Sequence, residues 1–103
     1  MSPTTVSKRP SFTADIDRHA VRLSMRNLDI AIRFLDAIDR TVDLLRLHPE
    51  SGGTVELPGL PPGIRALAVT DFRRFTVFYS YGSAEVCLVR CLYQGLDLPA
   101  VDF

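Results

Sequence analysis

Three apolar runs separated by turn residues constrain the fold more than any other feature of this chain. The runs are residues 64–69, 75–81 and 86–93. The first and third runs are apolar apart from Arg65 and Arg90, and the second alternates large apolar residues with Thr and Ser, patterns that predict β-strands. The connections at 70–74 and 82–85 are short enough for tight turns, and Gly82 is the residue that such a turn favours. We therefore expect the three strands to pair as an antiparallel meander.

A first amphipathic helix is predicted before the strands, from a cap at Thr13 to about Met25. Asp15 and Asp17 would lie in its first turn, where acidic side chains suit the helix dipole. The residues expected to face the core are Ile16, Ala20 and Leu23. His19 lies beside this stripe and is interpreted as a core-edge or solvated residue, because no catalytic motif accompanies it.

A second, longer helix is predicted between a cap at Asn27 and His48, because Pro49 disfavours helical backbone in the residue before it. Its apolar stripe follows the helical spacing i, i+3, i+4, i+7. The stripe comprises Ala31, Phe34, Leu35, Ile38, Val42 and Leu45. Only a few residues separate the two helices, so they should form an antiparallel hairpin that covers the sheet.

The rest of the chain completes a single α+β domain spanning residues 1–103. Residues 4–12 allow only a short edge strand, because Pro10 cannot donate a hydrogen bond to a neighbouring strand. Residues 50–63 contain four of the six glycines and are predicted to be one long loop. The predicted architecture is a short N-terminal edge strand and an antiparallel two-helix hairpin, packed on an antiparallel meander of three strands.

Composition weighs against several classes of function. The chain has 12 basic and 12 acidic residues, so no net charge draws it to nucleic acid or to an anionic membrane. It has no signal-peptide-like or membrane-spanning apolar run, which predicts a cytoplasmic protein. Cys87 and Cys91 would lie on one strand face about 13 Å apart, too far for a disulfide, and are interpreted as core residues. No metal or cofactor site is predicted.

The order of these elements resembles the ParE/RelE superfamily of toxins from bacterial type II toxin-antitoxin modules. The resemblance covers nearly the whole chain from Phe12. The local signatures are Asn27 with Ala31 and Phe34, then 48–52, 63–67, 77–79, 89–93 and 97–99. It implies a partner antitoxin, whose disordered tail would cover apolar grooves or add a strand to a sheet edge.

Function differs between branches of this superfamily. RelE-like members are ribosome-dependent mRNA endonucleases that need cations to hold the message, whereas ParE-like members are reported as inhibitors of DNA gyrase. The RelE branch commonly has Arg after an aromatic residue of the middle strand, but Thr76 follows Phe75 here. That branch is also basic after the last strand, where this chain has Gln94, Gly95 and Leu96. Scarce cations disfavour stabilisation of a pentacovalent phosphate, which favours the ParE branch.

The ParE branch usually ends its last strand with Arg-x-Leu-His-Gly-x-Arg-Asp. This chain keeps Arg90, Leu92 and Asp97 but has Tyr93 in place of the His. No catalytic residue is assigned. The candidate residues for contact with a target are Arg65, Arg73, Arg74, Arg90, Tyr93 and Asp97. A salt bridge between Arg90 and Asp97 is an equally good interpretation, and the adjacent pair Arg73 and Arg74 is more typical of a solvated turn.

The leading hypothesis is a non-enzymatic ParE-like toxin that binds DNA gyrase and is neutralised by a cognate antitoxin. The alternatives are a RelE-like nuclease acting on ribosome and mRNA, and a degenerate member without toxicity. One geometric observation would favour the nuclease: the gathering of Arg65, Arg73, Arg74 and Arg90 in a single concave basic patch.

Overall fold

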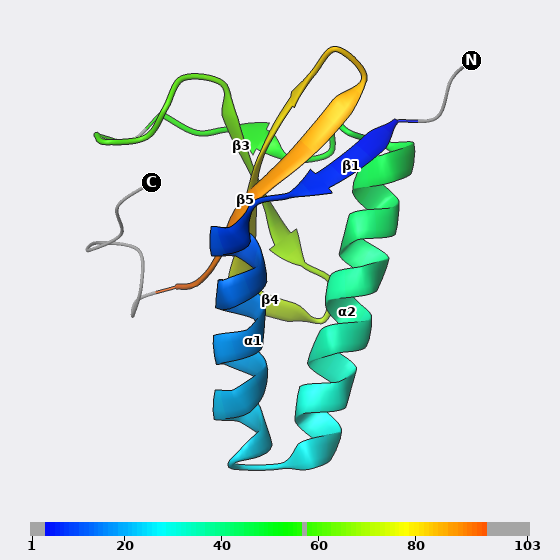
Figure 1. Cartoon of the computed structure of the whole chain (residues 1–103), viewed down its shortest axis with the longest axis vertical. Helices are drawn as coiled ribbons and strands as arrows, with labels where there is room; N and C mark the ends of the chain where they lie inside the picture. Colours follow the sequence, from blue (N-terminus) through cyan, green and yellow to red (C-terminus); the bar gives the residue numbers. More distant parts are fainter. Residues whose placement is uncertain (1–3, 57, 95–103) are drawn as a thin grey trace.

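The computed structural model describes residues 4–56 and 58–94 as a five-stranded mixed sheet with a helical hairpin on one face (Figure 1). The helices are α1 (Pro10–Ser24) and α2 (Leu28–Leu47). The strands are β1 (Thr5–Lys8), β2 (Gly53–Thr54), β3 (Ile64–Val69), β4 (Phe72–Gly82) and β5 (Glu85–Tyr93). This arrangement confirms the predicted α+β fold with its edge strand, hairpin and meander.

The sheet has the strand order β1-β5-β4-β3-β2. Strand β1 pairs with β5 in parallel, whereas the other three pairings are antiparallel. The predicted long loop therefore contains a strand, because Gly53 and Thr54 pair with Ala66 and Arg65 of β3. Both edges of the meander are thus partly covered by short strands.

Helix α1 begins at Pro10, earlier than predicted. Proline suits the first helical position because its backbone angle is preset and its missing N–H would have no partner there. Arg9 is the N-cap residue and makes no side-chain capping bond. The predicted cap at Thr13 is therefore wrong, and Asp15 lies in the body of the helix rather than in its first turn.

Helix α2 begins after Asn27, whose side-chain oxygen accepts a hydrogen bond from the Ile30 N–H at 3.3 Å, as predicted. Its buried face is turned slightly from the predicted stripe. Leu35 is 40% exposed, while Thr41 is fully buried. The hydroxyl of Thr41 donates to the Ala37 carbonyl and accepts from the Thr70 N–H, so a polar residue fits in the core without an unsatisfied group.

The turns of the meander differ from the prediction. Only Thr70 and Asp71 separate β3 from β4, and Asp71 takes a φ of 66°. Between β4 and β5, Ser83 and Ala84 have φ values of 53° and 59°. Two consecutive positive φ values fit a type I′ hairpin loop. Gly82 does not supply this conformation, because it pairs with the residue that follows the turn.

A β-bulge at Val89 changes the face on which the end of β5 lies. Tyr79 pairs with Leu88 and Phe78 pairs with Arg90, so Val89 between them has no partner in this register. One extra residue inverts the alternation of side chains beyond it. Cys91 consequently joins the core beneath the helices, whereas Cys87 packs on the opposite face. The prediction that the two cysteines share a face is wrong, and both are free thiols.

The main core lies between the helices and the sheet. Phe34 and Leu45 of α2 are fully buried there, against Val77 and Tyr79 of β4. A second, smaller cluster lies on the opposite face of the sheet. It comprises Ile64, Phe78, Val89 and Leu92. The sheet therefore buries apolar side chains on both faces, which explains why its strands are apolar almost continuously.

Candidate functional site

Side chains of α1 complete the edge of β5 beyond the end of β1. Ser11 donates to the Val89 carbonyl at 2.7 Å, and the Asp15 carboxylate accepts from the Cys91 N–H at 3.0 Å. His19 donates through Nε2 to the Cys91 carbonyl at 2.7 Å. The three residues are spaced four apart and therefore lie on one helix face. This polar seam of Ser11, Asp15 and His19 supplies backbone partners that a longer β1 would otherwise provide.

Arg90 is bound into the same seam. Its Nε and Nη2 atoms donate to the two Asp15 carboxylate oxygens at 2.6 and 2.9 Å. The side chains of Arg90 and Asp15 are only 16% and 4% exposed. The guanidinium thus has a structural partner on α1 that the sequence analysis did not find. Asp97, its predicted partner, lies outside the described residues.

Arg65 stabilises the segment that follows α2. It donates to the Gly52 carbonyl at 2.7 Å, while the Tyr79 hydroxyl accepts from the Gly52 N–H and donates to the Pro49 carbonyl. Burial raises the pKa of Tyr79 above its ordinary value of 10.0, against the lowering effects of the Gly52 hydrogen bond and the Arg65 charge. A Cβ at Gly52 would lie 2.8 Å from the Ala66 carbonyl oxygen and from the Tyr79 ring, so this close approach requires glycine.

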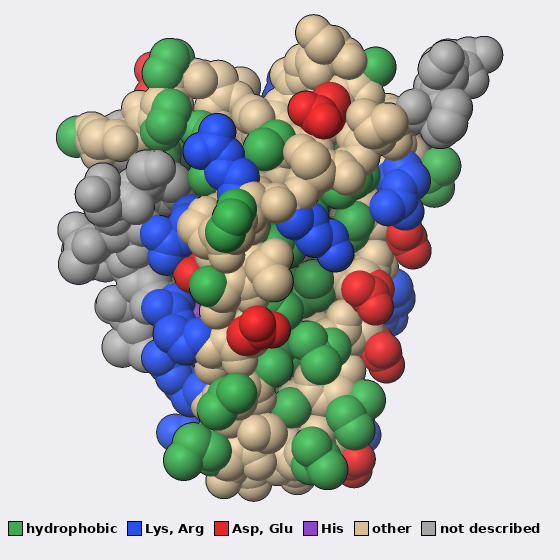
Figure 2. Space-filling view, in the orientation of Figure 1, with side chains coloured by type: hydrophobic (Ala, Val, Ile, Leu, Met, Phe, Trp, Pro, Cys, Tyr) green, Lys and Arg blue, Asp and Glu red, His purple; other side chains and the backbone are tan. Residues whose placement is uncertain are grey.

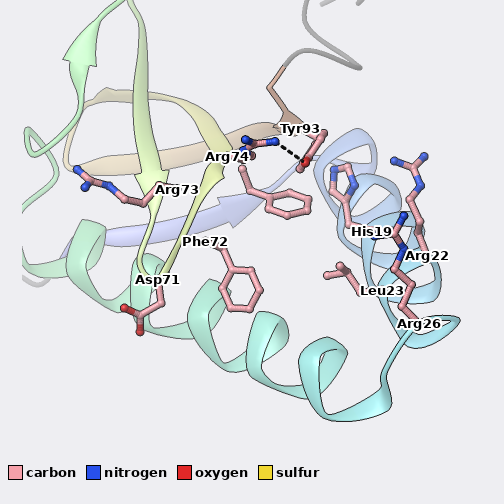
Figure 3. Close-up of a pocket in the computed structure, with 10 residues that line it drawn as sticks. His19, Arg22, Leu23, Arg26, Asp71, Phe72, Arg73, Arg74 and Tyr93 are labelled. Atoms are coloured by element: carbon pink, nitrogen blue, oxygen red, sulfur yellow. Dashed lines mark hydrogen bonds between the residues drawn. The ribbon is translucent and has the colours of Figure 1, made fainter.

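Arg73, Arg74 and Tyr93 line a cavity of about 420 Å³ between the end of α1 and the start of β4 (Figure 3). Arg22 near the end of α1 and Arg26 in the turn after it also line the cavity, although neither was predicted as a site residue. The remaining lining residues are His19, Leu23, Asp71, Phe72 and Phe75. We call this the arginine cavity.

Guanidinium groups lie on two sides of the arginine cavity. Figure 3 shows Arg22 and Arg26 at the α1 side and Arg74 beside Tyr93, with Arg73 extending away to the outer side of β4. Nη1 of Arg74 lies 3.5 Å from the Tyr93 hydroxyl. The one acidic lining residue in the described part, Asp71, pairs with Arg40 of α2 at 3.2 Å. The cavity is therefore positively charged although the chain as a whole is neutral.

The structure separates the four arginines that would have formed a nuclease patch. Arg73 and Arg74 border the cavity, Arg65 binds the segment after α2, and Arg90 is held by Asp15. The basic character of the cavity comes from Arg73 and Arg74 of β4 together with Arg22 of α1 and Arg26 of the turn after α1. Arg22 and Arg26 are four residues apart in the sequence, a spacing that is typical of neighbouring side chains on a helix. Nothing in the sequence places them opposite β4.

Apolar side chains are exposed at the closed end of the helical hairpin. Val21 and Met25 of the α1 end are 61% and 82% exposed, and Leu28 and Ile32 of α2 are 65% and 50% exposed. We call these four residues the hairpin patch. Figure 2 shows hydrophobic side chains gathered over the lower part of the molecule, where the hairpin lies. Exposed apolar residues that cluster in this way are typical of surfaces that bind proteins.

No group of three His, Cys, Asp or Glu residues within 4–56 and 58–94 is placed to bind a metal ion. Neither helix in this part of the chain is long and apolar enough to cross a membrane.

The fold and the comparisons together define the class of protein. The chain superposes on a solved chain described as "Chromosomal ParDE TA system from P. aeruginosa" with a TM-score of 0.71 and 17% identity. The match covers 88% of this chain and 96% of that chain, so the two share a fold. No curated protein matches the sequence significantly.

The family follows from the sequence itself. Residues 6–96 match the model of the family described as "ParE toxin of type II toxin-antitoxin system, parDE". The chain therefore belongs to the ParE toxin family.

Proposed function

We propose that this chain is a toxin that binds DNA gyrase and is held inactive by a cognate antitoxin. The observation that supports this proposal most directly is the match to the ParE toxin family over residues 6–96. The solved relative described as a ParDE toxin-antitoxin system supports an antitoxin partner. Both partners would be met in the cytoplasm, so the proposal includes that location.

The contacts of two arginines in the sheet, Arg65 and Arg90, favour a toxin that binds its target over one that cleaves RNA. A RelE-like nuclease would use cations to stabilise charge on the reacting phosphate. Arg90 already forms a bidentate pair with a buried carboxylate, and Arg65 is engaged with backbone carbonyls. Recruiting either to a phosphate would break these contacts. Cleavage of mRNA on the ribosome therefore remains the second hypothesis, and loss of toxicity the third.

The hairpin patch is the surface that we assign to the antitoxin. Strand addition has little room at the β5 edge, because β1 and the polar seam occupy it. The opposite edge is covered by β2 along two residues. An amphipathic antitoxin segment would instead bury the exposed Leu28, Ile32, Val21 and Met25 side chains against its own apolar face.

Induced expression with separate readouts of DNA supercoiling and message integrity tests the function. We expect growth arrest and altered plasmid supercoiling with intact mRNA, all relieved by co-expression of the product of the adjacent small gene. Cleaved mRNA with normal supercoiling would support the nuclease instead. Unimpaired growth without the antitoxin would support the degenerate member and refute the toxin.

Charge substitutions in the hairpin patch test the docking surface. Leu28→Glu and Ile32→Glu place a charge on exposed positions and should abolish co-purification with the antitoxin while leaving the fold intact. Arg33→Glu on the exposed side of the same helix is the matched control and should co-purify normally. Normal co-purification of the two patch variants would place the antitoxin elsewhere.

A further inference from the structure

We propose that the arginine cavity binds a nucleotide, with the phosphate on Arg22, Arg26 and Arg74 and the base against the aromatic wall. This site lies beyond the proposed function, because neither gyrase binding nor neutralisation by an antitoxin requires it. The ligand chemistry is a phosphate ester attached to a flat aromatic ring. A free nucleotide and a nucleic-acid strand both supply that chemistry.

The arginine cavity holds an excess of positive charge that no carboxylate of the described residues neutralises. In the described ranges, no acidic side chain forms an ion pair with Arg22, Arg26 or Arg74. Elsewhere in the same ranges, arginines do find carboxylates, as Arg46 does with Asp43 at 2.8 Å. Like charges held together without a counter-ion repel one another. A phosphate would relieve this repulsion, and the planar guanidinium fork suits its oxygens.

Phe72, Phe75 and Tyr93 form an aromatic wall of the arginine cavity. Phe75 lies with its ring centroid 4.9 Å from that of Tyr93 and 4.7 Å from that of Phe34. Phe72 extends the wall, with its centroid 5.6 Å from that of Phe34. Because Phe34 and Phe75 are buried, they hold the half-buried Phe72 and Tyr93 rings in place. Ordered rings of this kind provide stacking surfaces for bases.

The size and shape of the arginine cavity also fit a nucleotide. A volume of about 420 Å³ lies within the range of roughly 300–1,000 Å³ typical of small-molecule pockets. An acidic peptide side chain would engage the arginines but leave the aromatic wall uncovered. A nucleotide covers both parts of the cavity, which is why we favour it over an acidic segment of a protein partner.

Calorimetric titration of the purified full-length chain tests the proposal. The probes are thymidine 5′-monophosphate, thymidine, inorganic phosphate and polyglutamate. We expect the monophosphate to bind more tightly than any of the other three. Equal binding of inorganic phosphate would reduce the cavity to an anion site and overturn the proposal. Tighter binding of polyglutamate, or no binding of the monophosphate, would also overturn it.

Charge-removing variants locate the binding. Arg26→Gln and Arg74→Gln should each weaken binding of the monophosphate by about tenfold or more, because each loses a charged hydrogen bond. Arg46→Gln removes the same charge from a residue at the far end of α2, away from the cavity, and should bind like the unmodified chain. Circular dichroism of each variant verifies folding. Unchanged affinity in both cavity variants would refute the location.

A single-stranded oligomer of about eight deoxythymidines distinguishes the two sources of the ligand. If it binds no better than the monophosphate, the site takes a free nucleotide. If it binds more tightly, the site takes a strand, and three arginines that each neutralise a different phosphate of that strand predict a slope of log affinity against log salt of about −2. Arg74→Gln should reduce that slope by about 0.7. Normal growth arrest in a variant that has lost nucleotide binding would leave the proposed toxin function standing.

Discussion

Replacing Asp15 with alanine tests the ion pair that joins α1 to β5. The carboxylate accepts two hydrogen bonds from Arg90, one from the Cys91 N–H and a longer one from Arg18 at 3.5 Å. The substitution would leave a guanidinium that is 16% exposed without this partner, together with a fully buried N–H group. Breaking one side of a buried pair costs about 3–5 kcal/mol. That loss is a large part of the roughly 5–15 kcal/mol that stabilises a typical domain.

Urea denaturation followed by circular dichroism measures this cost as a shift in midpoint at constant slope. Asp15→Asn keeps an acceptor for Cys91 and should lose less, about 1.5–3 kcal/mol, because only the charged part of the interaction is removed. Asp17→Ala on the exposed side of the same helix is the control and should change stability by no more than about 0.5 kcal/mol.

A double substitution separates the ion pair from the hydrogen bond. Asp15→Leu combined with Arg90→Met removes both charges, so it should be less destabilising than Asp15→Ala alone. A loss below about 1 kcal/mol for Asp15→Ala would refute the reasoning. Strictly additive effects of Asp15→Leu and Arg90→Met on the free energy of unfolding would also refute it, because residues that interact deviate from additivity.

Three further predictions concern the core, a turn and a titrating side chain. Phe34→Ala should lower the free energy of unfolding by about 3–5 kcal/mol in urea denaturation, because Phe34 is fully buried, and a loss under about 1 kcal/mol would contradict its packing. Ala84→Gly should raise the thermal midpoint through a gain of about 0.5–1 kcal/mol, because alanine at a φ of 59° is strained, and an unchanged midpoint would argue against this turn. The native protein keeps the Tyr79 phenol proton to higher pH than the unfolded chain, so unfolding should become easier as the pH rises above about 10. Tyr79→Phe should lose that part of the pH dependence, and identical slopes in both proteins would contradict the raised pKa.

Much of the fold was predictable because its signals are local. Asn27 and Pro49 bound α2 through backbone chemistry within a few residues, and the prediction of that helix is confirmed. The three long strands were recognisable for the same reason. The start of α1 was missed because Thr13 looks like a cap, whereas Pro10 already fits the first turn.

The candidate site was less predictable because its residues come from distant parts of the chain. Arg73, Arg74 and Tyr93 were named from the sequence and do line one cavity. Arg22 and Arg26 were not predicted, because no motif in the sequence singles them out. Their position opposite β4 depends on how α1 packs across the sheet.

The sequence by itself determined which segments form the two helices and the three long strands, because helical and extended backbone depend on neighbouring residues. Only the tertiary structure decided which charges meet. Asp15 and Arg90 are 75 positions apart, and they pair because β1 ends where α1 reaches the open edge of β5. The same docking brings the end of α1 to the start of β4 and creates the arginine cavity.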